Sequence, residues 1–152
     1  QHSFSTQVTD LDNIQNPSIH SLLSSKYHEA QMYRLNIHAE IPDPVTHNYL
    51  TDLDLAVVLG HLMDNAIHGA RKASEGFISL AYFDEEDCQS FIIESTIAEE
   101  QVPLSMMSTQ LSHPEGGIGV NAVQDILERY PNTSFSVRSQ NHKMMQILEM
   151  RP

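Results

Sequence analysis

The most constraining feature of this sequence is a long amphipathic pattern between Asp52 and Ala73. Thr51 stands where a helix N-cap is expected, and Asp54 follows three residues later as in a capping box. Apolar residues recur inside the pattern at intervals of three and four, as on one face of an α-helix: Leu55, Val58, Leu59, Leu62, Ala66 and Ala70. A helix with one apolar face has to bury that face against another layer.

Alternating apolar and polar residues predict the strands that this helix can cover. The alternation occurs at 35–41, at 77–83 and 90–95 around an acidic turn, and at 134–139 and 143–150 around a turn at 140–142. Further helices are expected at 17–33 and about 120–130. The order of these elements predicts an α+β two-layer sandwich, in which helices lie on one face of a mixed sheet.

Composition narrows the classes of partner. The 152 residues suit one domain, and 20 acidic against 8 basic side chains give a net charge of -12. This charge argues against nucleic acid or an anionic membrane surface as a partner, because phosphate groups attract lysine and arginine. The single cysteine, Cys88, fits a reducing compartment. No apolar run is long enough for a membrane span, and no signal peptide opens the chain.

The chain begins at Gln1 without a methionine, so we expect a fragment of a longer protein. Residues 1–16 are polar and weakly patterned, and we interpret them as a linker or as the end of an upstream helix. Pro17 suits the first turn of a helix. The domain is therefore expected to span residues 17–152.

A second stripe of side chains lies on the long helix. His61, Asn65 and His68 are spaced i, i+4 and i+7, so they share one narrow face. Asparagine is a poor helix former, so Asn65 needs a reason to be there, whereas solvent exposure is the simpler explanation for His68 taken alone. An amide oxygen is a hard neutral ligand that suits Mg²⁺ bridging to substrate phosphates. We therefore favour a binding role for Asn65.

Glycines precede the helix expected at about 120–130. The run Gly116-Gly117-Ile118-Gly119 would let backbone N–H groups approach an anion at a helix N-terminus. Taken alone, the run is a weak signal, because such glycines more often have a structural role in a turn. It does not match a dinucleotide-binding fingerprint, because a long irregular stretch precedes it instead of a strand.

Together these two motifs resemble a known superfamily. The string LGHLMDNAIHGA at 59–70 resembles the N box of the GHKL ATPases, and GGIGVNAVQDILERYPN at 116–132 resembles their glycine-rich G2 box. Within the superfamily, these strings, FIIESTI and the final MMQILEM are most similar to sensor histidine kinases of the peptide-pheromone, accessory-gene-regulator type. The resemblance covers about residues 14–150. It implies the Bergerat fold with an ATP lid loop.

The resemblance also implies roles for individual residues. Asn65 would coordinate Mg²⁺ between the ATP phosphates, and Ser95 would stand where the family reads the adenine amino group. Residues 97–115 would form the ATP lid, and glycines at its end would let it close over the phosphates. The implied ATP-binding set is His61, Asn65, His68, Ser95, Gly117, Ile118 and Gly119.

The implied function is that of the catalytic ATP-binding domain of a bacterial two-component sensor histidine kinase. It would bind Mg-ATP and donate the γ-phosphate to a histidine on an upstream dimerisation domain, for relay to a response regulator. His28 lies within the domain's own segment and is expected at the surface, so the fragment should not phosphorylate itself alone. The intact protein would be a homodimer whose cytoplasmic domain belongs to a membrane-anchored quorum-sensing receptor.

Departures from the family pattern leave alternatives open. His61 replaces an asparagine, Ser95 replaces an aspartate or asparagine, and the lysine of the usual lid motif is missing. A degenerate domain with weak or no nucleotide binding could act as an interaction module instead, and a weaker alternative is a stand-alone protein-serine kinase. The charge of -12 does not exclude ATP, because Mg²⁺, an asparagine and backbone N–H groups do not enter the count of basic residues.

Overall fold

The computed structural model describes residues 10–101 and 120–152. Helices and strands alternate along the chain much as the sequence patterns predict. The elements are α2 (Pro17–Met32), β1 (Asn36–Glu40), α3 (Asp52–Lys72), β2 (Phe77–Glu85), β3 (Cys88–Thr96), α5 (Val120–Glu128), β4 (Thr133–Gln140) and β5 (Lys143–Met150).

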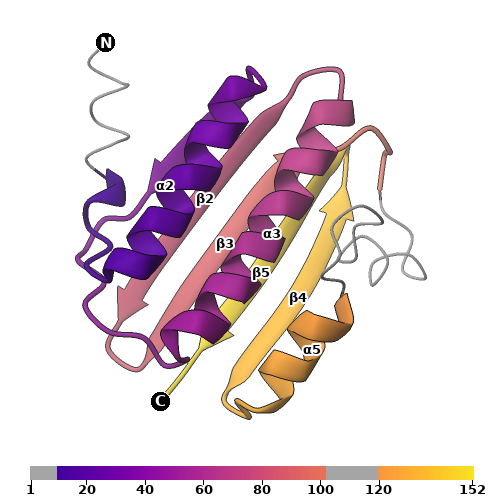
Figure 1. Cartoon of the computed structure of the whole chain (residues 1–152). Helices are drawn as coiled ribbons and strands as arrows, with labels where there is room; N and C mark the ends of the chain where they lie inside the picture. The colour runs from indigo at the N-terminus through magenta and orange to yellow at the C-terminus, as the bar shows by residue number, and fades with distance from the viewer. Residues whose placement is uncertain (1–9, 102–119) are drawn as a thin grey trace.

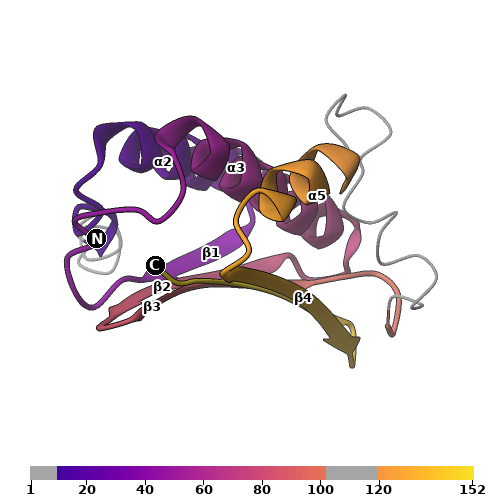
Figure 2. The ribbon, with the colours of Figure 1, turned by 90° about the horizontal axis from the view of Figure 1, so that it is seen from below.

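The strands form a five-stranded mixed sheet in the order β1-β2-β3-β5-β4. β1 runs parallel to β2, and the other neighbours are antiparallel. Figure 1 shows α2, α3 and α5 in front of the sheet, and Figure 2 shows all three on the same face. We call this covered face the inner face. The arrangement confirms the expected two-layer sandwich.

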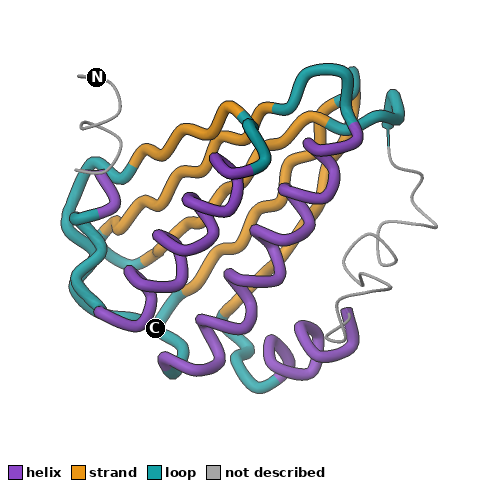
Figure 3. The backbone as a smooth tube through the Cα atoms, turned by 45° about the horizontal axis from the view of Figure 1, so that its top comes forward, coloured by secondary structure: helices purple, strands orange, loops and turns teal. Residues whose placement is uncertain are grey.

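Helix α3 lies across the middle of the inner face, beside α2 (Figure 3). Its predicted N-cap is confirmed, because the Thr51 side chain accepts a hydrogen bond from the Asp54 amide at 3.2 Å. All six apolar positions of its predicted stripe are buried. Each buried leucine of this kind contributes about 1.5–3 kcal/mol relative to an exposed one. The apolar stripe therefore fixes which side of α3 faces the sheet.

Short-range rules also account for the other ends and turns. The Asn16 side chain caps α2 by accepting from the amides of Ser18 and Ile19. Asn141 and His142 form the β4–β5 turn with φ values of 54° and 62°, as expected for the tight turns that join antiparallel strands. Both predicted hairpins are therefore present.

The packed core begins before α2. Leu11 and Ile14 are 4 % and 3 % exposed and belong to the main hydrophobic cluster. Ile14 also forms an isolated bridge with Val45, in the loop between β1 and α3. Two apolar residues in a polar stretch carry no periodicity, so the sequence pattern does not reveal this packing.

No helix in residues 10–101 or 120–152 combines the length and the hydrophobicity that crossing a membrane requires.

Candidate functional site

Polar side chains interrupt the apolar inner face at one end of the sheet. Along β3 the inward positions run from Phe91 and Ile93 to Ser95, and the apolar pattern resumes at Ile97. Along β5, Gln146 interrupts the inward row in the same way. A second small cluster lies beside these two polar residues: it contains Ile97 and Met144, which is opposite Ser95, and Val137, which is opposite Gln146, packs against it. Ser95 and Gln146 thus form a buried polar layer at the border between the main core and this small cluster.

Helix α3 places Asn65 over this polar layer. The Asn65 Nδ2 donates to Gln146 Oε1 at 3.3 Å, and the Gln146 Nε2 donates to the Leu62 carbonyl at 3.0 Å. Asn65 is 1 % exposed, and Ser95 and Gln146 are fully buried. Because Ser95 pairs with Met144, two residues from Gln146, the Cα atoms of Ser95 and Gln146 are about 7–8 Å apart. We call Asn65, Ser95 and Gln146 the inner polar patch.

Two atoms of the inner polar patch lack the hydrogen bonds that burial demands. Neither Asn65 Oδ1 nor Ser95 Oγ has a partner among the described residues. An unsatisfied buried polar atom costs about 1–3 kcal/mol, so such atoms are uncommon and need an explanation. An oxygen kept for a ligand is one such explanation, and the inner polar patch contains two such oxygens.

One turn after Asn65, the helix comes close to the end of β3. A Cβ atom added at Gly69 would lie 3.0 Å from the Ile97 Cγ2 and 3.4 Å from the Thr96 carbonyl oxygen. The side chain of Ile97 is buried against this turn of α3. Ile97 and Met144 thus form a small apolar surface next to Ser95.

The remaining residues of the predicted site are distributed unevenly. His61 is 6 % exposed and therefore lies on the buried side of α3, whereas His68 is only half-buried. Asp64, which adjoins Asn65 in sequence, pairs with Lys26 of α2 at 2.7 Å and thus faces α2. Gly117, Ile118 and Gly119 lie outside the described residues. The structure therefore brings Asn65 and Ser95 to one patch and says nothing of the glycines.

Only the first residues of the expected lid, 97–115, are described. The β4–β5 turn holds them: the Ile97 amide donates to the His142 carbonyl at 2.9 Å, and the His142 amide donates to the Glu100 carbonyl at 2.8 Å. The His142 Nδ1 lies 3.1 Å from the Ala98 carbonyl. Residues 98–100 are exposed while Ile97 is buried. The segment thus leaves the protein core directly after the inner polar patch.

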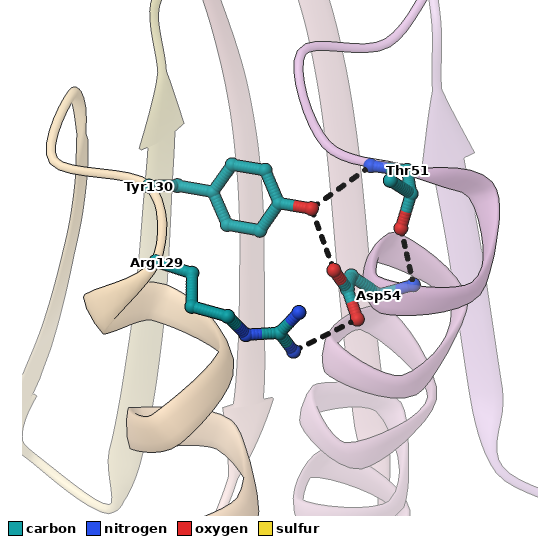
Figure 4. A network of polar contacts seen from close by, with 4 residues as sticks. All are labelled: Thr51, Asp54, Arg129 and Tyr130. Atoms are coloured by element: carbon teal, nitrogen blue, oxygen red, sulfur yellow. Dashed lines mark hydrogen bonds and ion pairs between the residues drawn. The ribbon is translucent and has the colours of Figure 1, made fainter.

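A polar network ties α5 to the start of α3 (Figure 4). The Tyr130 hydroxyl donates to the Asp54 carboxylate at 2.5 Å and accepts from the Thr51 amide at 3.2 Å. The Arg129 guanidinium contacts the other carboxylate oxygen of Asp54 at 3.1 Å. The Tyr130 hydrogen bond, aided by Thr51 and Arg129, lowers the pKa of Asp54 despite the desolvation of its carboxyl group. This network fixes the C-terminal end of the helix that follows the predicted G2 glycines.

The donor set determines which metal the patch suits. Among residues 10–101 and 120–152, no three His, Cys, Asp or Glu side chains are grouped to hold a metal ion. A zinc-type site is therefore absent from this part of the chain. Magnesium binds differently, through one or two protein oxygens with phosphates and water as the other ligands. The buried, unsatisfied Oδ1 of Asn65 fits that mode of binding.

Sequence reasoning missed two parts of the site. Gln146 was expected only as part of a strand, although a polar residue at an inward position of MMQILEM is a visible signal. The partners of Asp54 were also missed, because Tyr130 is 76 residues away along the chain. No local pattern indicates a contact of that separation.

Comparisons with known proteins agree with this architecture. The family described as "GHKL domain" matches residues 50–151, about two thirds of the chain. No curated protein matches the sequence. Among solved structures, a nucleotide-free catalytic domain of histidine kinase ThkA is 14% identical with a TM-score of 0.70, and the match covers 90% of this chain and 91% of that one.

Two further structures extend the comparison. The Acinetobacter baumannii histidine kinase AdeS is 15% identical with a TM-score of 0.63, covering 88% of this chain and 62% of that one. ThkA in complex with the response regulator protein TrrA is 14% identical with a TM-score of 0.67, covering 90% and 40% of the two chains. The chain therefore belongs to the GHKL domain family and has the fold of a histidine kinase catalytic domain.

Proposed function

We propose that this domain binds Mg-ATP at the inner polar patch, as the ATP-binding part of a sensor histidine kinase. The observation that carries the proposal is the oxygen of Asn65, which is buried, fixed in direction and without a hydrogen-bond partner among the described residues. Such an oxygen gains its missing interaction when a hard cation binds. GHKL membership supports ATP as the source of the phosphates.

Each neighbouring residue has a proposed task. Asn65 would hold the magnesium ion, which when bound neutralises phosphate charge. The Ser95 hydroxyl would hydrogen-bond the adenine, directly or through water. Ile97 and Met144 would supply apolar contacts beside it, and His61 and His68 complete the proposed ATP-binding set on α3.

The glycines before α5 supply the remaining part of the proposed site. Gly117, Ile118 and Gly119 would present backbone N–H groups to the phosphates at the start of that helix. The lid 97–115 would cover the nucleotide and exclude water. The network of Asp54 and Tyr130 would keep α5 in place while the lid moves.

The proposed reaction transfers the γ-phosphoryl group from ATP to a histidine nitrogen on an upstream dimerisation domain, leaving ADP. This domain would contribute positioning and charge stabilisation, which dominate phosphoryl transfer. The phosphoryl group would then pass to a response regulator, and the structure of ThkA with TrrA supports a partner of that class. From the motif resemblance, we place the intact protein among homodimeric, membrane-anchored pheromone receptors of quorum sensing.

Calorimetric titration with ATP, in the presence and absence of magnesium, tests the binding step. We expect saturable binding that depends on magnesium, and loss of most of that affinity in Asn65→Ala. Asn36→Ala, which removes an exposed amide from β1, is the matched control and should bind like the native protein.

Two results would contradict the proposal. If the native protein shows no saturable binding at millimolar nucleotide, the domain acts as an interaction module. If Asn65→Ala and Asn36→Ala bind with native affinity, the nucleotide site lies elsewhere.

A further inference from the structure

Gln146 is a buried polar residue whose two hydrogen bonds both point to α3. Its neighbours on the inward row of β5 are Met144 and Leu148, and all three are at most 1 % exposed. Its Nε2 donates to the Leu62 carbonyl at 3.0 Å and its Oε1 accepts from Asn65 Nδ2 at 3.3 Å. A buried amide in an apolar row has to satisfy both ends, and Gln146 does so with one helix.

The chemistry of the groups fixes the direction of this chain of hydrogen bonds. A backbone carbonyl can only accept, so the end of Gln146 that faces Leu62 has to be the NH₂ group. The opposite end that faces Asn65 is then the oxygen, and Asn65 has to present its own NH₂ group to it. This order follows from donors and acceptors alone, even though oxygen and nitrogen of an amide look alike. The Oδ1 of Asn65 is left pointing away from Gln146.

We propose that Gln146 is a positioning residue that orients Asn65, so that the amide oxygen and not the NH₂ group faces the bound magnesium ion. The inference rests on the proposed function, because it concerns how the same site is prepared. An Asn65 amide turned by 180° would present N–H groups to a cation and repel it. Gln146 excludes this state, because the turned amide would place two oxygens against each other.

The variant Gln146→Met tests this role, because methionine is similar in length and has no amide. Gln89→Met is a matched control. Gln89 is also fully buried, lies on β3 at the far end of the sheet and donates to the His47 carbonyl at 2.7 Å. Both variants remove one buried amide and should lose comparable stability, which thermal unfolding measures. Only Gln146→Met removes a contact to Asn65.

Calorimetry with Mg-ATP should show affinity reduced roughly 10- to 100-fold in Gln146→Met, the usual effect of removing a group that orients a metal ligand. Gln89→Met should stay within about twofold of the native protein, because the hydrogen bond of Gln89 goes to His47 at the other end of the sheet and not to the inner polar patch. A second measurement, amide hydrogen exchange, tests the same role without nucleotide. The side-chain NH₂ signals of Asn65 in NMR spectra, identified by their loss in Asn65→Ala, should exchange slowly with solvent in the native protein and faster in Gln146→Met.

The outcomes separate the two proposals. Weaker Mg-ATP binding and faster amide exchange in Gln146→Met, with Gln89→Met unchanged, support the positioning role. Native affinity in Gln146→Met, or an equal loss in both variants, overturns the positioning role and leaves the proposed function standing. No nucleotide binding by the native protein overturns the proposed function, and the cation-facing role of Asn65 with it.

Discussion

Asp54 joins two segments that are distant in sequence. Its carboxylate receives the Tyr130 hydroxyl at 2.5 Å and the Arg129 guanidinium at 3.1 Å, and its amide donates to the Thr51 cap. Hydrogen bonds to a charged group are worth about 1.5–3 kcal/mol, more than bonds between neutral groups. Asp54 therefore takes part in the N-cap of α3 through its backbone amide and holds the end of α5 through its carboxylate.

The lowered pKa of Asp54 makes stability depend on pH in a definite direction. The folded state binds the proton less readily than the unfolded state, whose carboxyl has the ordinary value of 3.8. The contribution of Asp54 is complete above that value and is lost as the pH falls through the lower folded pKa. We expect Asp54→Asn to lower the free energy of unfolding by about 1–3 kcal/mol at neutral pH. Urea unfolding of the native protein and of Asp54→Asn, at neutral pH and near pH 3, measures how much free energy of unfolding Asp54 contributes at each pH.

Two comparisons sharpen the test of Asp54. The native protein should lose more stability than Asp54→Asn when the pH is lowered, because the variant has no carboxylate to protonate. Asp87→Asn, in the exposed β2–β3 turn, should change neither the stability nor its pH dependence. Equal acid sensitivity of the native protein and Asp54→Asn would show that other groups control it.

Helix α3 contains two glycines in different surroundings. A Cβ atom added at Gly60 would lie 3.5 Å from Leu22, which is ordinary contact, whereas one added at Gly69 would lie 3.0 Å from Ile97. Glycine inside a helix costs about 1 kcal/mol relative to alanine. No close neighbour requires a glycine at position 60. At position 69, the absence of a side chain allows the helix to come close to the end of β3.

The two positions should therefore respond in opposite directions. We expect Gly60→Ala to stabilise the protein by about 0.5–1 kcal/mol through helix propensity. Gly69→Val should destabilise it by about 1–3 kcal/mol, because its branched side chain overlaps Ile97 and the Thr96 backbone. Thermal or urea unfolding of both variants checks the signs. If Gly69→Val is as stable as the native protein, Ile97 and the end of β3 can shift to accommodate the valine at little cost in free energy.

Local rules account for most of the elements. The spacing of apolar residues and the Thr51 cap predict α3, and strict alternation predicts the hairpins of β2–β3 and β4–β5. These features are predictable because each depends on residues a few positions apart. The packing of Leu11 and Ile14 cannot be predicted in this way, because it depends on the main hydrophobic cluster and on the bridge to Val45, which lie far away in the sequence.

At the scale of the whole molecule, charge is the dominant feature. The chain carries 20 acidic and 8 basic residues, so any anion approaches a negative protein. Charges farther apart than about 10 Å are largely screened at 0.1 M salt. A free nucleotide should therefore be repelled at low salt, and a magnesium-bound one much less.

This imbalance predicts the sign of a salt effect. Raising the salt concentration should strengthen the binding of magnesium-free ATP, because screening removes repulsion. Binding of Mg-ATP should change little. Calorimetric titrations at low and moderate salt, with and without a chelator, compare the two. Weakening of magnesium-free ATP binding by salt would instead indicate a local cluster of basic residues at the site.

The sequence by itself determined the helices, the hairpins, the two-layer class and the two motifs that resemble GHKL boxes. All of these depend on residue type and short spacing, and GHKL membership agrees with them. Asn65 and Ser95 could also be named as candidates, since they stand inside or beside those motifs.

Only the tertiary structure decided which side chains meet. Gln146 lies 81 residues from Asn65 and Tyr130 lies 76 residues from Asp54, yet these pairs are in contact. Both contacts form because β5 lies beside β3, on which α3 packs, and because α5 packs against α3. The direction of the Asn65 amide follows from the first contact. It depends on which donor and acceptor groups the folded chain brings together, a property that no local pattern contains.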